Sequence, residues 1–366
     1  MAFFNREKEI AKIKAILSKE PNVIWFFYGP INSGKTALIT KVINELSEDY
    51  RVFYINFRGF EGGYEKFIKT MFEVGDEGLW QKIRAKAPII SAALDYVEKV
   101  TKKINTSIEL PVEVIKMLYT GSMEPEKVDV FSYLEKLMKR FKEKGFKPIL
   151  IFDELQVIKE EINATGMPLL AKLFNFFIRM TKETHLCHCL CLTSDSLFIE
   201  EIYRNAHLEG RMRSFLVDDL DKESAFKMYD AFGFEQKELI WDYIGGKIGD
   251  MVLFFEEKKI GLSEAEIAKA MLRDTAEKID ALLERVEFGN VRINFSGKEE
   301  KIEIKKLRKV LEIFKDKWEV EKREIEPVYR DYLIKENVLF FDPTKGIVRP
   351  QGRLIWRAIK EVVRRF

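Results

Sequence analysis

One stretch near the amino end of the chain decides the fold. It reads Val23-Ile24-Trp25-Phe26-Phe27-Tyr28-Gly29-Pro30-Ile31-Asn32-Ser33-Gly34-Lys35-Thr36. The first six residues are apolar, too few for a helix and rich in side chains that favour β-structure, so they predict a strand buried on both faces, as in a parallel sheet. The next eight match G-x-x-x-x-G-K-[ST], in which a glycine-containing loop joins a strand to a helix. A helical pattern follows, from Thr36 to Leu46.

This loop predicts a phosphate-binding site. Its glycines let the backbone curl so that consecutive N–H groups face phosphate oxygens, and the start of the next helix adds positive potential. We expect Lys35 to neutralise the β- and γ-phosphates and the Thr36 hydroxyl to ligate Mg²⁺. The expected cofactors are therefore ATP or ADP with Mg²⁺. The residues expected to hold the nucleotide are Gly29, Pro30, Ile31, Asn32, Ser33, Gly34, Lys35, Thr36 and Ala37.

Acidic residues end another predicted strand. Residues 51–57 and 148–152 are further β-rich runs, and the second of these leads directly into Asp153 and Glu154. The carboxyl ends of parallel strands meet at one edge of a sheet, so Asp153 is expected to reach the Mg²⁺ shell. Glu154 is placed to polarise an attacking water as a general base. Two acids in tandem favour a hydrolase over a nucleotide kinase or a passive binder.

A fourth strand is predicted over residues 186–193, and Ser194 follows it directly. The Ser194 hydroxyl is a candidate to hydrogen-bond the γ-phosphate or the attacking water. The alternative is that Ser194 and its polar neighbours cap the next helix, because Ser and Asp are preferred caps.

The same strand contains a cluster of cysteine and histidine, Cys187, His188, Cys189 and Cys191. Zinc accepts such ligands, but alternation along a strand sends the three thiols to one face and the imidazole to the other. We therefore expect buried thiols rather than a zinc site.

Composition sets the broad class of the protein. The chain has 366 residues, 46% hydrophobic and 33% charged, which predicts a folded protein of two or three domains. The amino end carries charged residues where a signal peptide needs an apolar run, so we expect no signal peptide. No run of about 20 apolar residues occurs, so we expect no membrane span. Free thiols suit a reducing compartment, so a cytoplasmic location is expected.

The last seventy residues predict a separate, basic domain. The net charge of the chain is only +2, but residues 298–366 hold 19 Lys or Arg against 13 Asp or Glu. Helical patterns over 305–318 and 328–336 precede two β-runs joined by a Pro/Gly turn, which indicates a winged helix-turn-helix domain. In the closing helix, Ile355, Ile359, Val362 and Phe366 are expected to face inward. The opposite stripe is expected to form a continuous basic face, made of Arg353, Arg357, Lys360 and Arg364.

That basic face has two candidate partners. It could bind the phosphates of DNA, or it could form a contact surface for a protein or for another domain of this chain.

Taken together, these segments resemble the archaeal ATPase family of P-loop proteins, related to AAA+ and STAND ATPases. The resemblance rests on the loop, on the Asp-Glu pair and on an opening helix of the form F-x-x-R-x-x-E. It continues through a polar residue after the fourth strand, a Gly-Arg element and a glycine pair. The matching residues are Phe3-Phe4-Asn5-Arg6-Glu7-Lys8-Glu9-Ile10, Leu192-Thr193-Ser194, Leu208-Glu209-Gly210-Arg211 and Trp241-Asp242-Tyr243-Ile244-Gly245-Gly246.

The resemblance implies ATP binding with Mg²⁺, hydrolysis, and a helical lid that closes over the nucleotide. It supports the roles given to Lys35, Thr36, Asp153 and Glu154, and it favours Ser194 as a contact of the γ-phosphate. It also makes Arg211 a candidate contact of the γ-phosphate, either in its own subunit or in a neighbour, which would require an oligomer. The alternative for Arg211 is a surface salt bridge near Asp218 and Asp219. One departure is that Lys247-Ile248-Gly249 follows the glycine pair, where the family often has Pro.

The predicted architecture is therefore an α/β P-loop sheet with helices on both faces, then a helical lid and a winged helix-turn-helix domain. The predicted domains are residues 1–217, 218–292 and 293–366. The predicted function is a Mg²⁺-dependent ATPase whose nucleotide state is coupled to a DNA or protein partner. The alternative is a nucleotide-gated switch or DNA-binding regulator that turns over little ATP.

Overall fold

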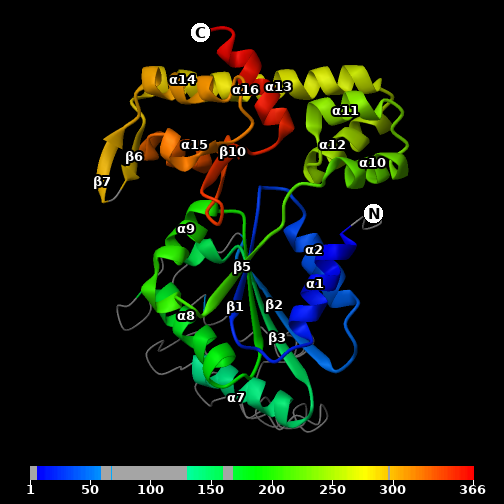
Figure 1. Cartoon of the computed structure of the whole chain (residues 1–366), viewed down its shortest axis with the longest axis vertical. Helices are drawn as coiled ribbons and strands as arrows, with labels where there is room; N and C mark the ends of the chain where they lie inside the picture. The colour runs from blue at the N-terminus through cyan, green and yellow to red at the C-terminus, as the bar shows by residue number, and fades with distance from the viewer. Residues whose placement is uncertain (1–5, 59–66, 68–129, 160–167, 296) are drawn as a thin grey trace, which may run out of the picture.

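A five-stranded parallel sheet forms the centre of the first half of the molecule (Figure 1). The computed structural model describes residues 6–58, 67, 130–159, 168–295 and 297–366. The strand order is β2-β3-β4-β1-β5, so β1 is a central strand, as its continuous apolar run predicts. The strands are β1 (Ile24–Tyr28), β2 (Tyr50–Asn56), β3 (Lys147–Asp153), β4 (His188–Thr193) and β5 (Met212–Leu216).

Helices cover both faces of this sheet, as predicted (Figure 1). Alternate residues of β1 separate into two hydrophobic clusters: Phe26 and Tyr28 pack on one face, and Phe27 on the other. β1 is therefore buried on both faces, which fixes its place inside the sheet between β4 and β5. The covering helices are α1 (Glu7–Leu17) and α2 (Lys35–Asn44) on one face, and α7 (Val130–Glu143), α8 (Leu169–Ile178) and α9 (Ser196–Arg204) on the other.

The three cysteines are buried on a single face of the sheet. Cys187, Cys189 and Cys191 are at most 1% exposed and belong to the cluster beneath α7–α9, whereas Leu190 faces the other layer. Burial raises the pKa of the Cys191 thiol. His188 bonds through Nε2 to the Lys19 carbonyl oxygen, 3.0 Å away. This confirms the expected alternation, and within the described part of the chain no group of three or more His, Cys, Asp or Glu forms a metal site.

The second half of the chain consists mainly of helices around one continuous hydrophobic cluster. This cluster extends from Leu220 to Val363 and includes both the predicted lid and the basic domain. The long helix α13 packs against both α11 and α16, so it links the two parts (Figure 1). The helices are α10 (Lys222–Ala231), α11 (Lys237–Ile244), α12 (Ile248–Lys259), α13 (Glu264–Gly289), α14 (Ile304–Ile313), α15 (Pro327–Lys335) and α16 (Arg353–Val363).

The carboxyl-terminal strands follow the predicted order of two helices and a hairpin. Strands β9 (Leu339–Asp342) and β10 (Ile347–Pro350) pair antiparallel, and β8 (Val320–Glu321) adds to β10. These elements follow the order expected of a winged helix. The winged-helix assignment and the three domain boundaries stay predictions. None of the described helices is long and apolar enough to cross a membrane.

Some elements differ from the sequence-based expectation. The edge strand β5 was missed because Arg213 and Ser214 separate its buried residues Met212 and Phe215, so it lacks the continuous apolar run of β1. The short polar strands β6 (Arg292–Phe295) and β7 (Lys298–Lys301) were also missed. The inward stripe of α16 is rotated from the predicted one. Phe366 is 43% exposed, and the buried residues of α16 are Leu354, Ala358, Ile359, Val362 and Val363.

The β9–β10 hairpin packs directly on the first half of the molecule. Phe340 is fully buried there, and its ring stacks on that of Tyr28 with the centroids 6.5 Å apart. The Tyr28 hydroxyl donates to Asp342 Oδ1 at 2.8 Å. Beside the hairpin, Arg330 of α15 forms an almost fully buried ion pair with Glu200 of α9, 3.1 Å apart. The hairpin therefore contacts the last residue of the strand that leads into the phosphate-binding loop.

We predict that Phe340→Ala lowers the free energy of unfolding by about 3–5 kcal/mol, because it leaves a cavity at this buried junction. Denaturant titration followed by circular dichroism measures the change. Phe288→Ala is the matched control: its side chain is 83% exposed, so it should alter stability little. Equal stability of the two variants would contradict the assigned packing.

Candidate nucleotide-binding site

The backbone of the predicted loop is tightly constrained between β1 and α2. A Cβ atom at Gly29 would lie 2.1 Å from the carbonyl oxygen of Val217, so only glycine fits there. Gly34 has a φ of 89°, in the left-handed region that favours glycine, and no side chain caps the start of α2 behind it. The first N–H groups of α2 are therefore open toward the loop, as an anion site requires.

Lys35 is buried at the centre of the loop. Its Nζ donates to the carbonyl oxygens of Gly29 at 3.0 Å and Pro30 at 2.9 Å. Burial lowers the pKa of this lysine to about 8, although the charge of Glu154 acts in the opposite direction. Lys35 is therefore a cation with poor solvation, which favours exchange of its carbonyl partners for a stronger anionic one.

Thr36 and Asp153 meet at the carboxyl ends of β1 and β3, as predicted. The Thr36 hydroxyl donates to Asp153 Oδ2 at 2.8 Å, and the Tyr54 hydroxyl donates to the same oxygen. Hydroxyl and carboxylate oxygens are the ligand types that Mg²⁺ prefers. The donor set therefore fits Mg²⁺. Tyr54, on the neighbouring strand β2, was not anticipated.

Glu154 has an unusual backbone and several hydrogen-bond partners. Its φ of 57° lies in the left-handed region, which for a residue other than glycine costs of order 1–3 kcal/mol and tends to occur at functional sites. Its carboxylate accepts from Arg58 at 2.9 Å, from Gln156 Nε2 at 2.6 Å and from Ser194 Oγ at 3.3 Å. Burial alone would raise the pKa of Glu154, but the bonds from Gln156 and Arg58 outweigh burial and lower it. Glu154 is thus held ionised.

Ser194 and Asp195 divide the two roles considered for this turn. Asp195 caps α9, because its side chain accepts from the N–H groups of Leu197 and Phe198. Ser194 instead points its hydroxyl at Glu154. The structure therefore brings Ser194 to the predicted site and assigns capping to its neighbour.

Arg211 does not lie at the site of its own subunit, which corrects one alternative for this residue. Its carbonyl oxygen accepts from the Ile24 N–H at the start of β1, whereas the loop follows Tyr28 at the other end of that strand. At a rise of roughly 3.3 Å per residue, these ends are about 13 Å apart. The surface salt-bridge alternative is also wrong: Arg211 donates to the His207 carbonyl, and Asp218 pairs with Arg349. A contact in a neighbouring subunit stays a prediction.

Residues that follow the glycine pair lie directly on the loop. Lys247 Nζ donates to the Ile31 carbonyl at 3.0 Å and lies 3.4 Å from Asp219. The Gly249 N–H donates to the Asn32 carbonyl at 3.1 Å. The segment that follows the glycine pair in this chain therefore contacts the loop backbone directly.

The first residues of the opening helix and the carboxyl-terminal domain also hold the loop. Arg6 donates to the carbonyl oxygens of Ser33 at 2.7 Å and Asp218 at 2.6 Å. Gln351, just after β10, accepts from the Ile31 N–H at 3.2 Å. The preceding residues of the quoted motif, Phe3 to Asn5, lie outside the described residues.

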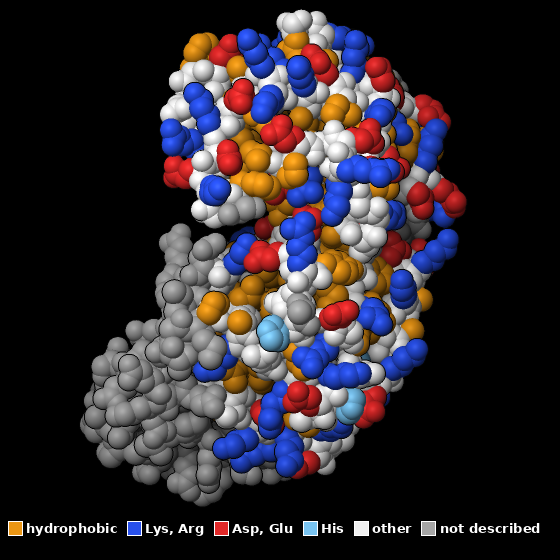
Figure 2. All heavy atoms as spheres, turned by 60° about the vertical axis from the view of Figure 1, so that its left-hand side comes forward, with side chains coloured by type: hydrophobic (Ala, Val, Ile, Leu, Met, Phe, Trp, Pro, Cys, Tyr) orange, Lys and Arg blue, Asp and Glu red, His pale blue; other side chains and the backbone are white. Residues whose placement is uncertain are grey.

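The predicted continuous basic face of α16 is wrong. Arg353 packs over the Trp241 ring, 4.8 Å from its centroid, and Arg357 packs over Tyr243 at 4.1 Å and pairs with Asp242. Two of the four basic side chains are thus used against α11, because that helix presents aromatic rings and an acid to them. Figure 2 shows basic and acidic side chains interspersed over the visible face of the upper half of the molecule.

Sequence reasoning missed several residues that contact the candidate site: Tyr54, Arg58, Gln156, Lys247 and Gln351. Tyr54 and Arg58 lie near the carboxyl end of β2, where the same sheet-edge rule that found Asp153 could have found them. Ser33 Oγ is buried without a hydrogen-bond partner among the described residues, so the loop retains an unused polar group that suits an oxygen-rich ligand.

Comparison with known proteins agrees with this geometry. Residues 3–254 match a family described as an ATPase domain predominantly from Archaea. Residues 265–363 match the carboxyl-terminal domain of uncharacterized ATP-binding proteins like MJ1010.

Two full-length relatives come from Methanocaldococcus jannaschii. The uncharacterized ATP-binding protein MJ0147 is 42% identical over 379 residues, covering 99% of this chain and 98% of the relative. The uncharacterized ATP-binding protein MJ0075 is 39% identical over 376 residues, covering 99% of both chains.

A solved structure supports the fold across nearly the whole chain. The Walker-type ATPase PABY2304 of Pyrococcus abyssi superposes with a TM-score of 0.61 at 17% identity, covering 98% of this chain and 96% of that one. With the loop, the acidic strand end and the family match in place, the chain belongs to the archaeal ATPase family and is an ATP-binding protein.

Proposed function

We propose that this ATP-binding protein hydrolyses ATP with Mg²⁺ and transmits the state of its nucleotide to the carboxyl-terminal domain. The observation that carries the proposal is the convergence of Lys35, Thr36, Asp153, Glu154 and Ser194 at the carboxyl ends of β1, β3 and β4. A phosphate loop, an oxygen ligand pair and an ionised carboxylate are the parts that phosphoryl transfer to water needs.

Each residue has a distinct task in this proposal. The loop amides and Lys35 bind the phosphates, Lys35 exchanging its two carbonyl partners for phosphate oxygens. Thr36 and Asp153 hold Mg²⁺, which when bound neutralises charge on the phosphates. Glu154 accepts a proton at its carboxylate from the attacking water, and Ser194, bonded to Glu154, orients that water. The bond from Arg58 must open for Glu154 to take up this role.

We predict that Glu154→Gln abolishes most ATP turnover but retains ATP binding, because the amide cannot accept the proton yet keeps the shape of the side chain. Steady-state phosphate release and equilibrium binding measure the two properties. Lys35→Ala is the companion variant and should lose ATP binding. If the wild type hydrolyses ATP at an appreciable rate and Glu154→Gln does so equally fast, Glu154 is not the general base.

We also predict that ATP binding takes up protons near pH 8. With a pKa of about 8, Lys35 is about half deprotonated at that pH, and bound phosphate would raise its pKa, so about half a proton enters per ATP. Affinity should therefore be constant well below pH 8 and fall as the pH rises above it. Isothermal titration in buffers of different ionisation enthalpy measures the uptake, and the same protein at pH 6.5 is the control. Equal affinity at pH 7 and pH 9 would contradict the prediction.

The proposed coupling route starts at Ile31. Its N–H is bonded to Gln351 of the carboxyl-terminal domain, and its carbonyl is bonded to Lys247 at the start of α12. A loop that turns its N–H groups to phosphate must break the first of these bonds. Nucleotide binding and the position of the carboxyl-terminal domain therefore depend on one another.

We predict that Gln351→Ala binds ATP about two- to tenfold more tightly, the equivalent of one released hydrogen bond. The variant should also lose part of the ATP-dependent change in hydrogen exchange of β9 and β10. Gln236→Ala, an exposed glutamine at the start of α11, is the matched control. Unchanged affinity together with unchanged exchange would contradict the coupling route.

A nucleotide-gated switch with little turnover is the second candidate, and one observation favours it. The Arg58–Glu154 ion pair occupies one oxygen of the proposed base, and breaking this pair before each turnover should slow basal hydrolysis. Slow turnover with tight retention of ADP would identify the switch. The partner, DNA or protein, is proposed to bind the basic carboxyl-terminal domain through surfaces other than Arg353 and Arg357.

A further inference from the structure

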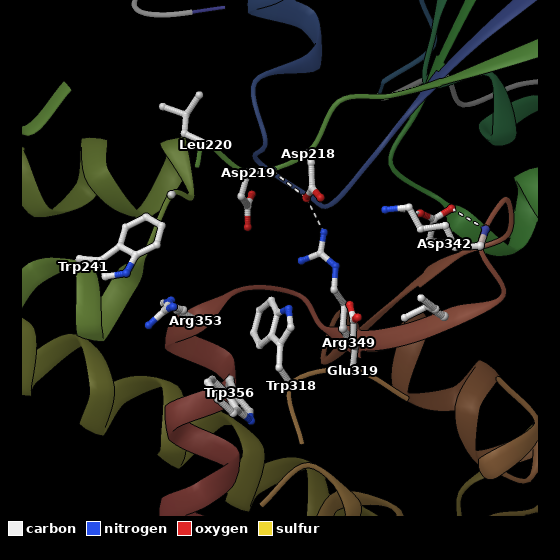
Figure 3. A pocket seen from close by; sticks show the side chains of 13 residues that line it. Asp218, Asp219, Leu220, Trp241, Trp318, Glu319, Asp342, Arg349, Arg353 and Trp356 are labelled. Carbon is white, nitrogen blue, oxygen red and sulfur yellow. Dashed lines mark hydrogen bonds and ion pairs between the residues drawn. The ribbon is translucent and has the colours of Figure 1, made fainter. Parts of the chain in front are cut away.

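A cavity of about 480 Å³ lies between the lid and the carboxyl-terminal domain, beneath the linker from β5 to α10 (Figure 3). That volume falls within the range of roughly 300–1,000 Å³ typical of small-molecule sites. No residue of the phosphate loop, 29–37, lines it, so it is separate from the candidate ATP site. Its walls come from three parts of the chain: Asp218 to Leu220, α11, and the segment from Trp318 to Trp356.

Three of the chain's five tryptophans converge on this cavity. Trp241 comes from α11, Trp318 precedes β8, and Trp356 lies on α16. Trp318 and Trp356 meet edge to face with their centroids 5.3 Å apart, and all three side chains are only half-buried. Figure 3 shows Arg353 lying among the three rings. A cation already lies over one face of each indole: Arg353 over Trp241 at 4.8 Å, Arg349 over Trp318 at 5.5 Å and Lys360 over Trp356 at 3.4 Å. A planar ligand ring would therefore stack on the remaining exposed indole surface.

The free hydrogen-bonding groups on this side of the cavity are donors. In the described structure, Arg353 has no carboxylate partner, and the indole N–H groups of Trp241 and Trp318 have no acceptor. Trp356 is different, because its N–H donates to the Phe314 carbonyl at 2.7 Å. Arg353 is also the first residue of α16, whose start has no side-chain cap. A guanidinium beside an uncapped helix start favours an anion.

Most of the acids around the cavity are already compensated. Asp218 pairs with Arg349, Asp219 lies beside Lys247, and Asp342 accepts hydrogen bonds from Tyr28 and Thr344. Glu319 is the exposed exception; in the view of Figure 3 it lies on the far side of Trp318 from Arg353. An anion at Arg353 therefore meets acids that are mostly compensated.

We propose that this cavity binds a nucleotide unit, with the base stacked on the tryptophans and the phosphate on Arg353. The unit is either a free mononucleotide or one residue of a single-stranded nucleic acid, which share this chemistry. The proposal does not depend on ATP hydrolysis, because it uses no residue of the phosphate loop.

The test is tryptophan fluorescence of the full-length Lys35→Ala protein, titrated in separate arms with AMP and with a ten-nucleotide oligothymidylate. The Lys35→Ala background removes the phosphate-loop lysine, so binding reports the second site. We expect saturable quenching in at least one arm. Quenching by AMP only identifies a mononucleotide site, and quenching by the oligonucleotide identifies a single-strand site. Arg353→Met, which keeps the stem of the side chain packed, and Trp318→Leu should each weaken binding about tenfold or more.

Arg364→Met is the matched control, because Arg364 is exposed on the far end of the same helix and should not affect binding. Circular dichroism verifies that each variant is folded. The proposal is overturned if neither probe binds, or if binding is the same in Arg353→Met, Trp318→Leu and the control. Quenching that appears in the wild-type protein but not in the Lys35→Ala protein would assign the binding to the phosphate loop instead.

Discussion

The backbone of the phosphate loop is the constraint on which the rest of the structure depends. It leaves β1 at Tyr28, turns where only glycine fits against Val217, and enters α2 through a left-handed Gly34. Its remaining polar groups are held from three directions: Arg6 binds the Ser33 carbonyl, Lys247 binds the Ile31 carbonyl, and Gln351 accepts the Ile31 N–H. A buried backbone group needs a hydrogen-bond partner. A change in the loop conformation therefore alters hydrogen bonds to the opening helix, the lid and the carboxyl-terminal domain.

The catalytic carboxylate proposed here is positioned by competing interactions. Burial and a left-handed backbone at Glu154 are unfavourable, whereas Arg58, Gln156 and Ser194 stabilise its charge. The hydrogen bonds that keep the Glu154 carboxylate ionised also use its oxygens as acceptors. Glu154 must therefore release at least one of these partners before it can accept a proton from water.

The two halves of the molecule are joined by packing as well as by polar contacts. The cluster from Leu220 to Val363 makes the lid and the carboxyl-terminal domain one body, and the β9–β10 hairpin inserts Phe340 into the core of the sheet. Movements of the carboxyl-terminal domain should therefore carry the lid with them. The cavity of the three tryptophans lies within this shared region, where a ligand would contact both.

The sequence by itself determined the strand–loop–helix at residues 23–44, the acids at the carboxyl end of β3 and the alternation that buries the cysteines, because each depends on local spacing within a buried strand. It also determined that Ser194 follows β4 at the same edge. Only the tertiary structure decided the rest. Arg211 falls at the opposite end of β5, Arg353 and Arg357 turn to the aromatic rings of α11, and Tyr54 and Arg58 join the site. The physical reason is that strand order and domain docking arise from contacts between segments far apart in the chain, which local periodicity does not encode.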